Sequence, residues 1–133
     1  MTAEEKAAAL QGAQYISLTT FRRSGAAVAT PVWFALDGTT VCVETGPATG
    51  KAKRIRHTPT VTLAPCTATG ALKGQAVEGT ARILESEAGR KAAQEALGRK
   101  YGRTRRLYYA LLNAVRRLSR RPATSLVYVA IEL

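Results

Sequence analysis

The sequence has few of the residue types on which catalytic and metal sites are usually built. It contains one histidine, His57, and two cysteines, Cys42 and Cys66, each inside an apolar run. We expect these two to be buried thiols, because a disulfide or a zinc site would need more such residues or other surroundings. The sequence has no paired carboxylates, no nucleophile elbow and no Walker phosphate loop. An enzyme made from this chain would therefore take its reactivity from a cofactor.

A long apolar run is also missing. No stretch approaches the roughly 20 residues needed to cross a bilayer, and residues 1–14 lack the pattern of a secretory signal. A cytoplasmic location is the resulting expectation. The chain has 133 residues, of which 46% are hydrophobic and 22% charged, as is usual for a folded globular protein. This length predicts one domain, residues 1–133.

Acidic residues are absent from two long parts of the chain. None occurs between Glu44 and Glu78 or between Glu95 and Glu132, and the formal net charge is +11. Surfaces of this kind attract polyanions: nucleic acid, anionic lipid, or a small ligand with several phosphates or carboxylates. The charge alone does not choose among these partners.

Short alternating runs separated by turn residues predict a mainly β (α+β) fold. Five strands are expected, over residues 15–21, 26–36, 40–45, 60–66 and 74–84. Their meander order favours a small antiparallel barrel or a sandwich. Pro31 cannot donate to a ladder, so the second strand either bulges there or lies at a sheet edge. Gly79 predicts a bulge in the fifth strand.

Helices are expected at both ends of the chain. One follows Thr2 and ends near residue 10, and two more, over residues 88–101 and 104–119, precede a last strand over residues 125–133. The helix over 104–119 has an apolar stripe with arginines on its flanks. The stripe favours packing on the sheet. The arginines within residues 99–121 leave open a non-catalytic module that binds nucleic acid or an anionic membrane.

A basic turn and helix are predicted between the third and fourth strands. Four cations, Lys51, Lys53, Arg54 and Arg56, lie within six positions after a turn that contains glycine, proline and threonine. Free backbone N–H groups, hydroxyls and cations at the start of such a helix suit an anion. The alternative is a solvated basic helix that only joins two strands.

Three blocks of the sequence carry a family resemblance. The blocks SLTTFRRSGAAVATPVWFAL, VETGPATGKAKRIRHTPTVTLAPC and VEGTARIL, in this order and spacing, resemble the split β-barrel superfamily named for pyridoxamine 5′-phosphate oxidase. They are most similar to its actinobacterial flavin/deazaflavin oxidoreductase branch, whose members are predicted to use coenzyme F-420. The resemblance implies a split barrel of about six strands and a homodimer with the site between subunits. It also implies an F-420-dependent transfer of hydride to an unsaturated or electrophilic small molecule.

The resemblance further implies which residues hold the cofactor. Backbone groups on the second strand would lie along the ring system, and hydroxyls, a backbone amide and cations after the third strand would hold the phosphate. The ring set is Thr30, Pro31, Val32 and Trp33, and the phosphate set is Thr45, Thr49, Gly50, Lys51 and Arg54. No residue stands out as a proton donor, so the catalytic residues are unknown.

Three other residues have implied roles in the same family. Gln75 would reach the cofactor from the partner subunit, and Lys53 and Arg56 would meet the carboxylates of a polyglutamate tail. FMN, haem or a related tetrapyrrole in the same fold is the alternative ligand. The C-terminal motif that binds pyridoxal phosphate in the true oxidases is not matched by residues 125–133, so oxidation of vitamin B6 is not expected.

Overall fold

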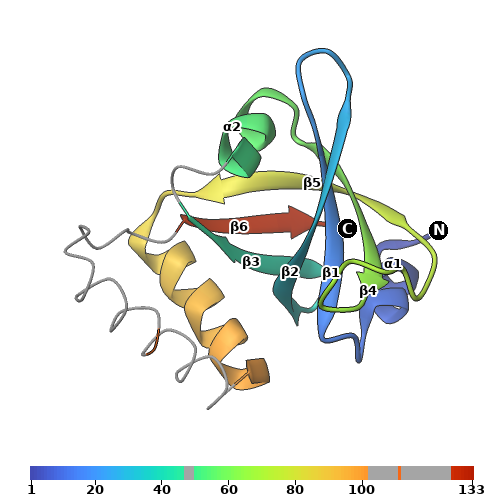
Figure 1. The fold of residues 1–133 in the computed structure, drawn as a ribbon. Coiled ribbons are helices and arrows are strands. Elements are labelled where there is room, and N and C mark those ends of the chain that lie inside the picture. The colour runs from blue at the N-terminus through green and yellow to red at the C-terminus, as the bar shows by residue number, and fades with distance from the viewer. Residues whose placement is uncertain (47–49, 102–110, 112–126) are drawn as a thin grey trace.

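The computed structural model describes residues 1–46, 50–101, 111 and 127–133 (Figure 1). Its elements in chain order are α1 (Ala3–Leu10), β1 (Tyr15–Phe21), β2 (Ala27–Asp37), β3 (Thr40–Thr45), α2 (Gly50–His57), β4 (Thr60–Cys66), β5 (Val77–Leu84), a helix over residues 87–101, and β6 (Val127–Glu132). Apart from Leu111, which is helical and exposed, the helix predicted over residues 104–119 lies outside the described residues. Among the helices that are described, none is both long and apolar enough to span a bilayer.

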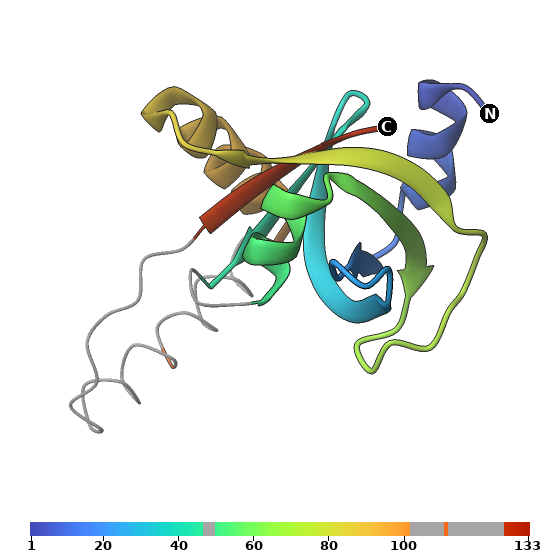
Figure 2. The ribbon, with the colours of Figure 1, turned by 90° about the horizontal axis from the view of Figure 1, so that it is seen from above.

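The six strands form one closed antiparallel barrel. Their order around it is β1-β2-β3-β6-β5-β4, so β6 lies between β3 and β5 (Figures 1 and 2). The predicted mainly β barrel, its N-terminal helix and its short basic helix between the third and fourth strands are therefore confirmed. The sandwich alternative is wrong. The last strand closes the sheet as predicted, and it pairs with β3 from Thr40↔Glu132 to Thr45↔Val127.

Alternation along each strand decides which side chains fill the barrel. On β1, Ile16, Leu18 and Thr20 point to one side and are fully buried, as the period of two requires. Full burial of a leucine or isoleucine contributes roughly 1.5–3 kcal/mol, so the apolar interior stabilises the closed barrel. The interior cluster consists of Leu10, Ile16, Leu18, Val32, Phe34, Val41, Val43, Ile55, Val61, Leu63, Val77, Ala81, Val129 and Ile131.

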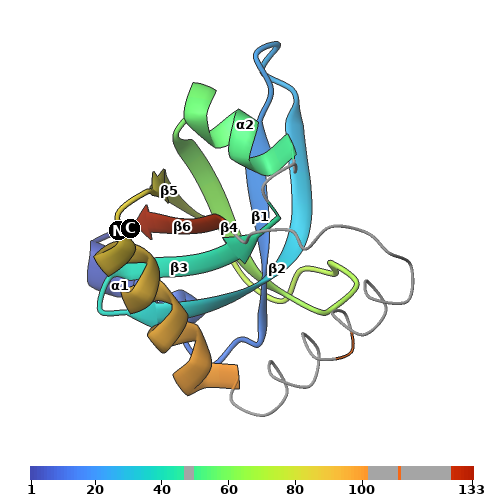
Figure 3. The ribbon, with the colours of Figure 1, turned by 90° about the vertical axis from the view of Figure 1, so that its left-hand side faces the viewer.

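The helix over residues 87–101 packs outside the barrel, against β2, β3 and β6. It passes in front of β2 and β3 in Figure 3, and Ala93, Ala96 and Leu97 form a second buried cluster with Ala35, Cys42 and Tyr128 of the sheet. Burial raises the pKa of the Cys42 thiol. Cys66 is likewise buried and unpaired, so the prediction of two buried thiols is confirmed.

The first half of β2 is a sheet edge. Residues 27–33 pair with β1, whereas pairing with β3 covers only Phe34 to Asp37. Within the described part of the chain, β1 is thus the only partner strand of residues 27–32. Pro31 pairs with Ser17 on this edge, which is one of the two predicted alternatives. A missing N–H is tolerated here because none of the described strands pairs with this part of β2 on its other side.

The bulge predicted at Gly79 is wrong. Val61 pairs with Gly79 in unbroken register between Thr60↔Thr80 and Thr62↔Glu78. The glycine is needed instead for a close approach, since a Cβ there would lie 2.7 Å from Cγ2 of Ile131 and 3.1 Å from the carbonyl oxygen of Glu132. Sequence patterns show the glycine but not the neighbouring strand that requires it.

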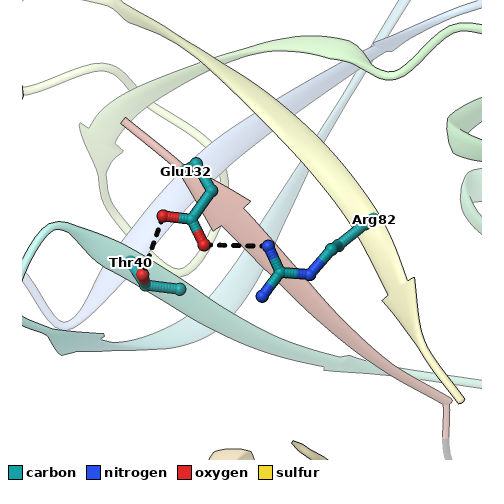
Figure 4. Close-up of polar contacts among 3 residues, drawn as sticks. All are labelled: Thr40, Arg82 and Glu132. Carbon is teal, nitrogen blue, oxygen red and sulfur yellow. Dashed lines mark hydrogen bonds and ion pairs between the residues drawn. The ribbon is translucent and has the colours of Figure 1, made fainter. Parts of the chain in front are cut away.

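Polar side chains join three strands on the outside of the barrel. Glu132 of β6 accepts a hydrogen bond from Thr40 of β3 at 3.0 Å and forms an ion pair with Arg82 of β5 at 2.9 Å (Figure 4). Both charged side chains are about half exposed, so the pair contributes little to stability. It links β3, β5 and β6 through one carboxylate on the outside of the barrel.

Candidate functional site

Helix α2 closes one end of the barrel beside the β1–β2 hairpin (Figures 1 and 3). Ala52 and Ile55, one turn apart, are 0% and 2% exposed and face the interior. Pro59 follows the helix and restricts the residue before it to extended backbone, which ends the helix at His57. Because two apolar positions fix the helix, its basic side chains are left to the rim and to the outside.

Lys51 and Arg54 lie on the rim face of α2 and bond to hydroxyls of the barrel. Lys51 Nζ donates to Thr30 Oγ1 of β2 at 3.3 Å, and Arg54 Nε donates to Thr20 Oγ1 of β1 at 2.6 Å. No carboxylate in the described residues forms an ion pair with either cation. Burial, and then the charge of Arg54, lower the pKa of Lys51. Two adjacent cations without an acid leave a positive potential that favours an anion.

The guanidinium of Arg54 folds back over the first residue of α2. A Cβ on Gly50 would collide with it, so this charge lies at the helix start, where backbone N–H groups lack helical partners. Gly50, Lys51 and Arg54, three residues of the predicted phosphate set, are thus brought together. Thr45 ends β3 and is buried, with 7% of its surface exposed. Thr49 lies outside the described residues.

The predicted ring set lies along the β2 edge, with its side chains on both faces. Thr30 contacts Lys51, Pro31 is exposed, and Val32 belongs to the barrel interior. Val32 can therefore offer only backbone groups. Trp33 points outward and stacks on Tyr101 at 5.2 Å between ring centroids and 23° between planes. We call Gly50, Lys51 and Arg54 the anion site, and the β2 edge meets it at the Lys51–Thr30 bond.

An open groove of about 740 Å³ lies between α2 and the tip of the β1–β2 hairpin. We call it the basic groove. It brings Lys53 and Arg56 together, as the tail prediction requires. Its lining is Phe21, Arg22, Arg23, Lys53, Arg54, Arg56 and His57, without an acidic residue. Arg54 belongs both to this lining and to the anion site, so the two are continuous.

Gln75 does not join these residues in the same chain. The fifth strand was predicted from residue 74, but β5 begins at Val77, so Gln75 lies on the exposed loop before it. Its neighbour Gly74 packs against Pro65 near the end of β4. Among the described residues, no hydrogen bond joins Gln75 to Lys51 or Arg54, whose side chains bond to Thr30 and Thr20.

Sequence patterns did not single out several residues that the structure places at the site. Thr20 was indicated in principle, because it is a polar residue at an inward position of β1 after Ile16 and Leu18. Arg22 and Arg23 of the groove lie between the strands predicted over residues 15–21 and 26–36, where the sequence indicates only a turn. Tyr101 is the last residue of the helix predicted over residues 88–101, and nothing in the sequence pairs it with Trp33.

Comparison with known proteins gives one family and one fold. The profile of the pyridoxamine 5′-phosphate oxidase family matches residues 2–132. An FAD-binding protein from Mesorhizobium loti has a TM-score of 0.67 at 15% identity, over 100% of this chain and 88% of that chain. The haem storage protein of Vibrio cholerae has a TM-score of 0.66 at 14% identity, over 99% and 90%. An F-420 reductase has a TM-score of 0.58 at 18% identity, over 94% and 90%.

Identities this low establish the fold and leave the ligand open. The split-barrel fold expected from the sequence is confirmed by these structures. Among curated protein sequences, no significant match is found.

Proposed function

Because the chain belongs to the pyridoxamine 5′-phosphate oxidase family, we propose that it is a coenzyme F-420-dependent oxidoreductase acting on an unsaturated or electrophilic small molecule. The observation that carries this proposal is the pair Lys51 and Arg54, two cations that have no acidic partner among the described residues and lie at a strand edge without a described outer strand. When bound, reduced deazaflavin supplies the hydride, from its C5. The similar fold of an F-420 reductase supports this choice of cofactor.

The anion site fits the phosphate of such a cofactor. Lys51 and Arg54 offer charge-assisted hydrogen bonds, and Gly50 offers a backbone amide at a helix start. Thr45 and Thr49 are proposed as additional hydroxyl donors. The half-buried position of Lys51 favours a bound anion, because a counter-charge offsets the desolvation that lowers its pKa.

The protein's own residues position the cofactor and keep water away from it. Backbone groups of Thr30 to Trp33 are proposed to lie along the ring, where β2 has no strand on its outer side within the described chain. An uncovered strand edge needs a cover. We propose that a second copy supplies it in a cytoplasmic homodimer, with Gln75 reaching the ring from the partner subunit. No side chain of the described residues is assigned a proton transfer.

The basic groove is proposed to hold the polyglutamate tail of F-420. Lys53 and Arg56 line it, and it continues from the anion site through Arg54. FMN has one phosphate and no such tail, so the groove favours F-420 over FMN. If charge removal at Lys53 and Arg56 leaves F-420 affinity unchanged, FMN or a tetrapyrrole becomes the better choice.

Titration of the purified protein with F-420 and with FMN tests the proposal. Lys51→Ala is expected to weaken F-420 binding at least tenfold, about 1.4 kcal/mol, because it removes a cation from the phosphate. Lys91→Ala is the control and leaves affinity unchanged, because Lys91 is on the exposed face of the helix over residues 87–101, which we call the outer helix. Failure of both cofactors to bind below about 1 mM, roughly −4 kcal/mol, rejects the oxidoreductase proposal.

The same purified protein can be used to test other ligands. The folds of an FAD-binding protein and a haem storage protein favour a flavin or haem as the second candidate. A haem titration followed in the Soret region tests haem binding.

The non-catalytic alternative is nucleic acid or membrane binding through residues 99–121, which are mostly outside the described residues. It requires steeply salt-dependent binding that is lost on charge reversal at Arg116 and Arg117.

A further inference from the structure

A tyrosine hydroxyl occupies the place of a strand pair between β1 and β2. The register runs to Tyr15↔Trp33, so the next pair would join Gln14 to Phe34. Tyr101 Oη lies between these two residues instead. It accepts from the Phe34 amide at 2.8 Å, and it lies 2.7 Å from the Gln14 carbonyl oxygen and 2.8 Å from that of Phe34. Its one proton serves one carbonyl at a time.

The hydroxyl marks the point where β2 changes partner. Before Phe34 the strand pairs with β1, and from Phe34 onward it pairs with β3. A buried backbone amide and carbonyl at such a junction need a partner, because an unsatisfied buried group is costly. Tyr101, only 8% exposed, supplies it from the last described turn of the outer helix. The hydroxyl therefore sets where the β1–β2 ladder stops.

The ring of Tyr101 contacts Trp33, which precedes Phe34 on the proposed cofactor-binding edge. Trp33 stacks on it in a nearly parallel arrangement. Lys100, the neighbour of Tyr101, makes two further contacts. Its ammonium lies 3.3 Å from the Phe34 ring centroid and donates a hydrogen bond to the Ala13 carbonyl at 2.7 Å. One helical turn thus holds Phe34, Trp33 and the chain that leads into β1.

We propose that Tyr101 is a positioning residue for the cofactor-binding edge: its hydroxyl holds the β1–β2 ladder open at Phe34, and its ring orients Trp33 beside the ring site. This inference rests on the proposed cofactor site. It assigns Tyr101 no contact with the reacting atoms. It predicts that the hydroxyl influences cofactor affinity and the environment of Trp33 beyond its effect on folding.

The test compares Tyr101→Phe with Ile131→Val, a truncation on the far wall of the barrel. Tyr101→Phe keeps the stacked ring and loses only the hydroxyl. It is expected to weaken F-420 or FMN binding at least tenfold and to shift the fluorescence emission of Trp33, the only tryptophan. Ile131→Val lowers the melting temperature but leaves both affinity and emission unchanged. Replacement of Tyr101 by 4-aminophenylalanine, which can donate and accept, should restore both.

The outcomes separate this inference from the proposed function. If neither cofactor binds the wild-type protein, the proposed function fails and the positioning role fails with it, although an emission shift would still locate the hydroxyl beside Trp33. If the wild type binds and Tyr101→Phe binds within twofold, only the positioning role is overturned. Equal weakening by Ile131→Val also overturns it, because general destabilisation would then explain the loss.

A measurement on the wild-type protein covers the case in which Tyr101→Phe does not fold. Coupling between two sites is reciprocal, so cofactor binding should slow amide hydrogen exchange at Phe34, whose N–H bonds to the hydroxyl. The Val61 amide on β4 is the control and should change less. Equal changes at Phe34 and Val61 would contradict a coupling through Tyr101.

Discussion

The buried hydroxyl of Thr20 positions the guanidinium of Arg54. It is fully buried among apolar side chains, and its oxygen accepts from Arg54 at 2.6 Å. A hydrogen bond to a charged group is worth roughly 1.5–3 kcal/mol. The Thr20–Arg54 bond therefore holds the guanidinium over the start of α2, where the proposed phosphate binds.

We predict that Thr20→Val destabilises the fold by about 1–3 kcal/mol, because Arg54 loses its acceptor in a partly buried place. Anion affinity should fall as well, since the guanidinium is no longer held over Gly50. Urea unfolding and cofactor titration measure the two effects. Thr19→Val is the matched control, because Thr19 points to the other face of β1 and is half-buried. An unchanged stability of Thr20→Val would show that the bond is not formed in solution.

Lys100 gives the fold a pH dependence. The residue as a whole is exposed, but its ammonium lies over the ring of the fully buried Phe34, and burial lowers its pKa to about 8. The unfolded chain holds this proton more tightly than the folded chain does. Stability from this group therefore rises with pH above about 8, and the cost of burying the charge is fully present below that pH.

The expected result is a difference between two proteins. Between pH 7 and 9.5 the unfolding free energy of the wild type should rise relative to that of Lys100→Met, which lacks the titrating group. Burial raises the pKa of Tyr101 to about 12, but Tyr101 is present in both proteins, so its titration cancels from the difference. Parallel pH profiles for the two proteins would contradict the desolvated position of Lys100.

Replacement of a glycine by alanine should have opposite effects on stability in a strand and in a helix of this protein. Gly79→Ala would push a Cβ to 2.7 Å from Ile131 and against the backbone of Glu132, so we expect a loss of about 1–3 kcal/mol. Gly98, in the outer helix, has nothing within 4 Å of its would-be Cβ. Gly98→Ala should stabilise by roughly 0.5–1 kcal/mol through better helix propensity. Thermal or urea unfolding measures the stability of both variants. A Gly79→Ala variant that is more stable than Gly98→Ala would contradict the close packing between β5 and β6.

The strands and the basic helix could be predicted because their signals are local. Period-two alternation and turn residues placed β1, β3 and β4 at their observed bounds, and the cluster of cations located α2. The contacts that build the site connect distant positions. Tyr101 lies 67 residues from Phe34 and 87 from Gln14, and Arg54 lies 34 from Thr20. No local pattern encodes such pairs, so the family resemblance, not periodicity, supplied the predicted residues of the site.

The predicted dimer is a property of the whole molecule. The β2 edge has no outer strand within the described residues, and a second copy is proposed both to cover it and to supply Gln75. Light scattering on the eluting protein should give twice the chain mass of 14.2 kDa. A monomer at micromolar concentration that still binds cofactor tightly would contradict an interface site.

The position of β6 has a consequence for how the chain folds. It inserts between β3 and β5, and it pairs Glu132 with Thr40, 92 residues away. During synthesis, β1 to β5 can pair as a ribbon, but two of its strands keep unpaired edges until residues 127–132 leave the ribosome. Barrel closure is therefore a late, long-range step, and topologies of this kind fold slowly. Until then the edges of β3 and β5 are exposed to other chains, and the unfinished chain is at its greatest risk of aggregation.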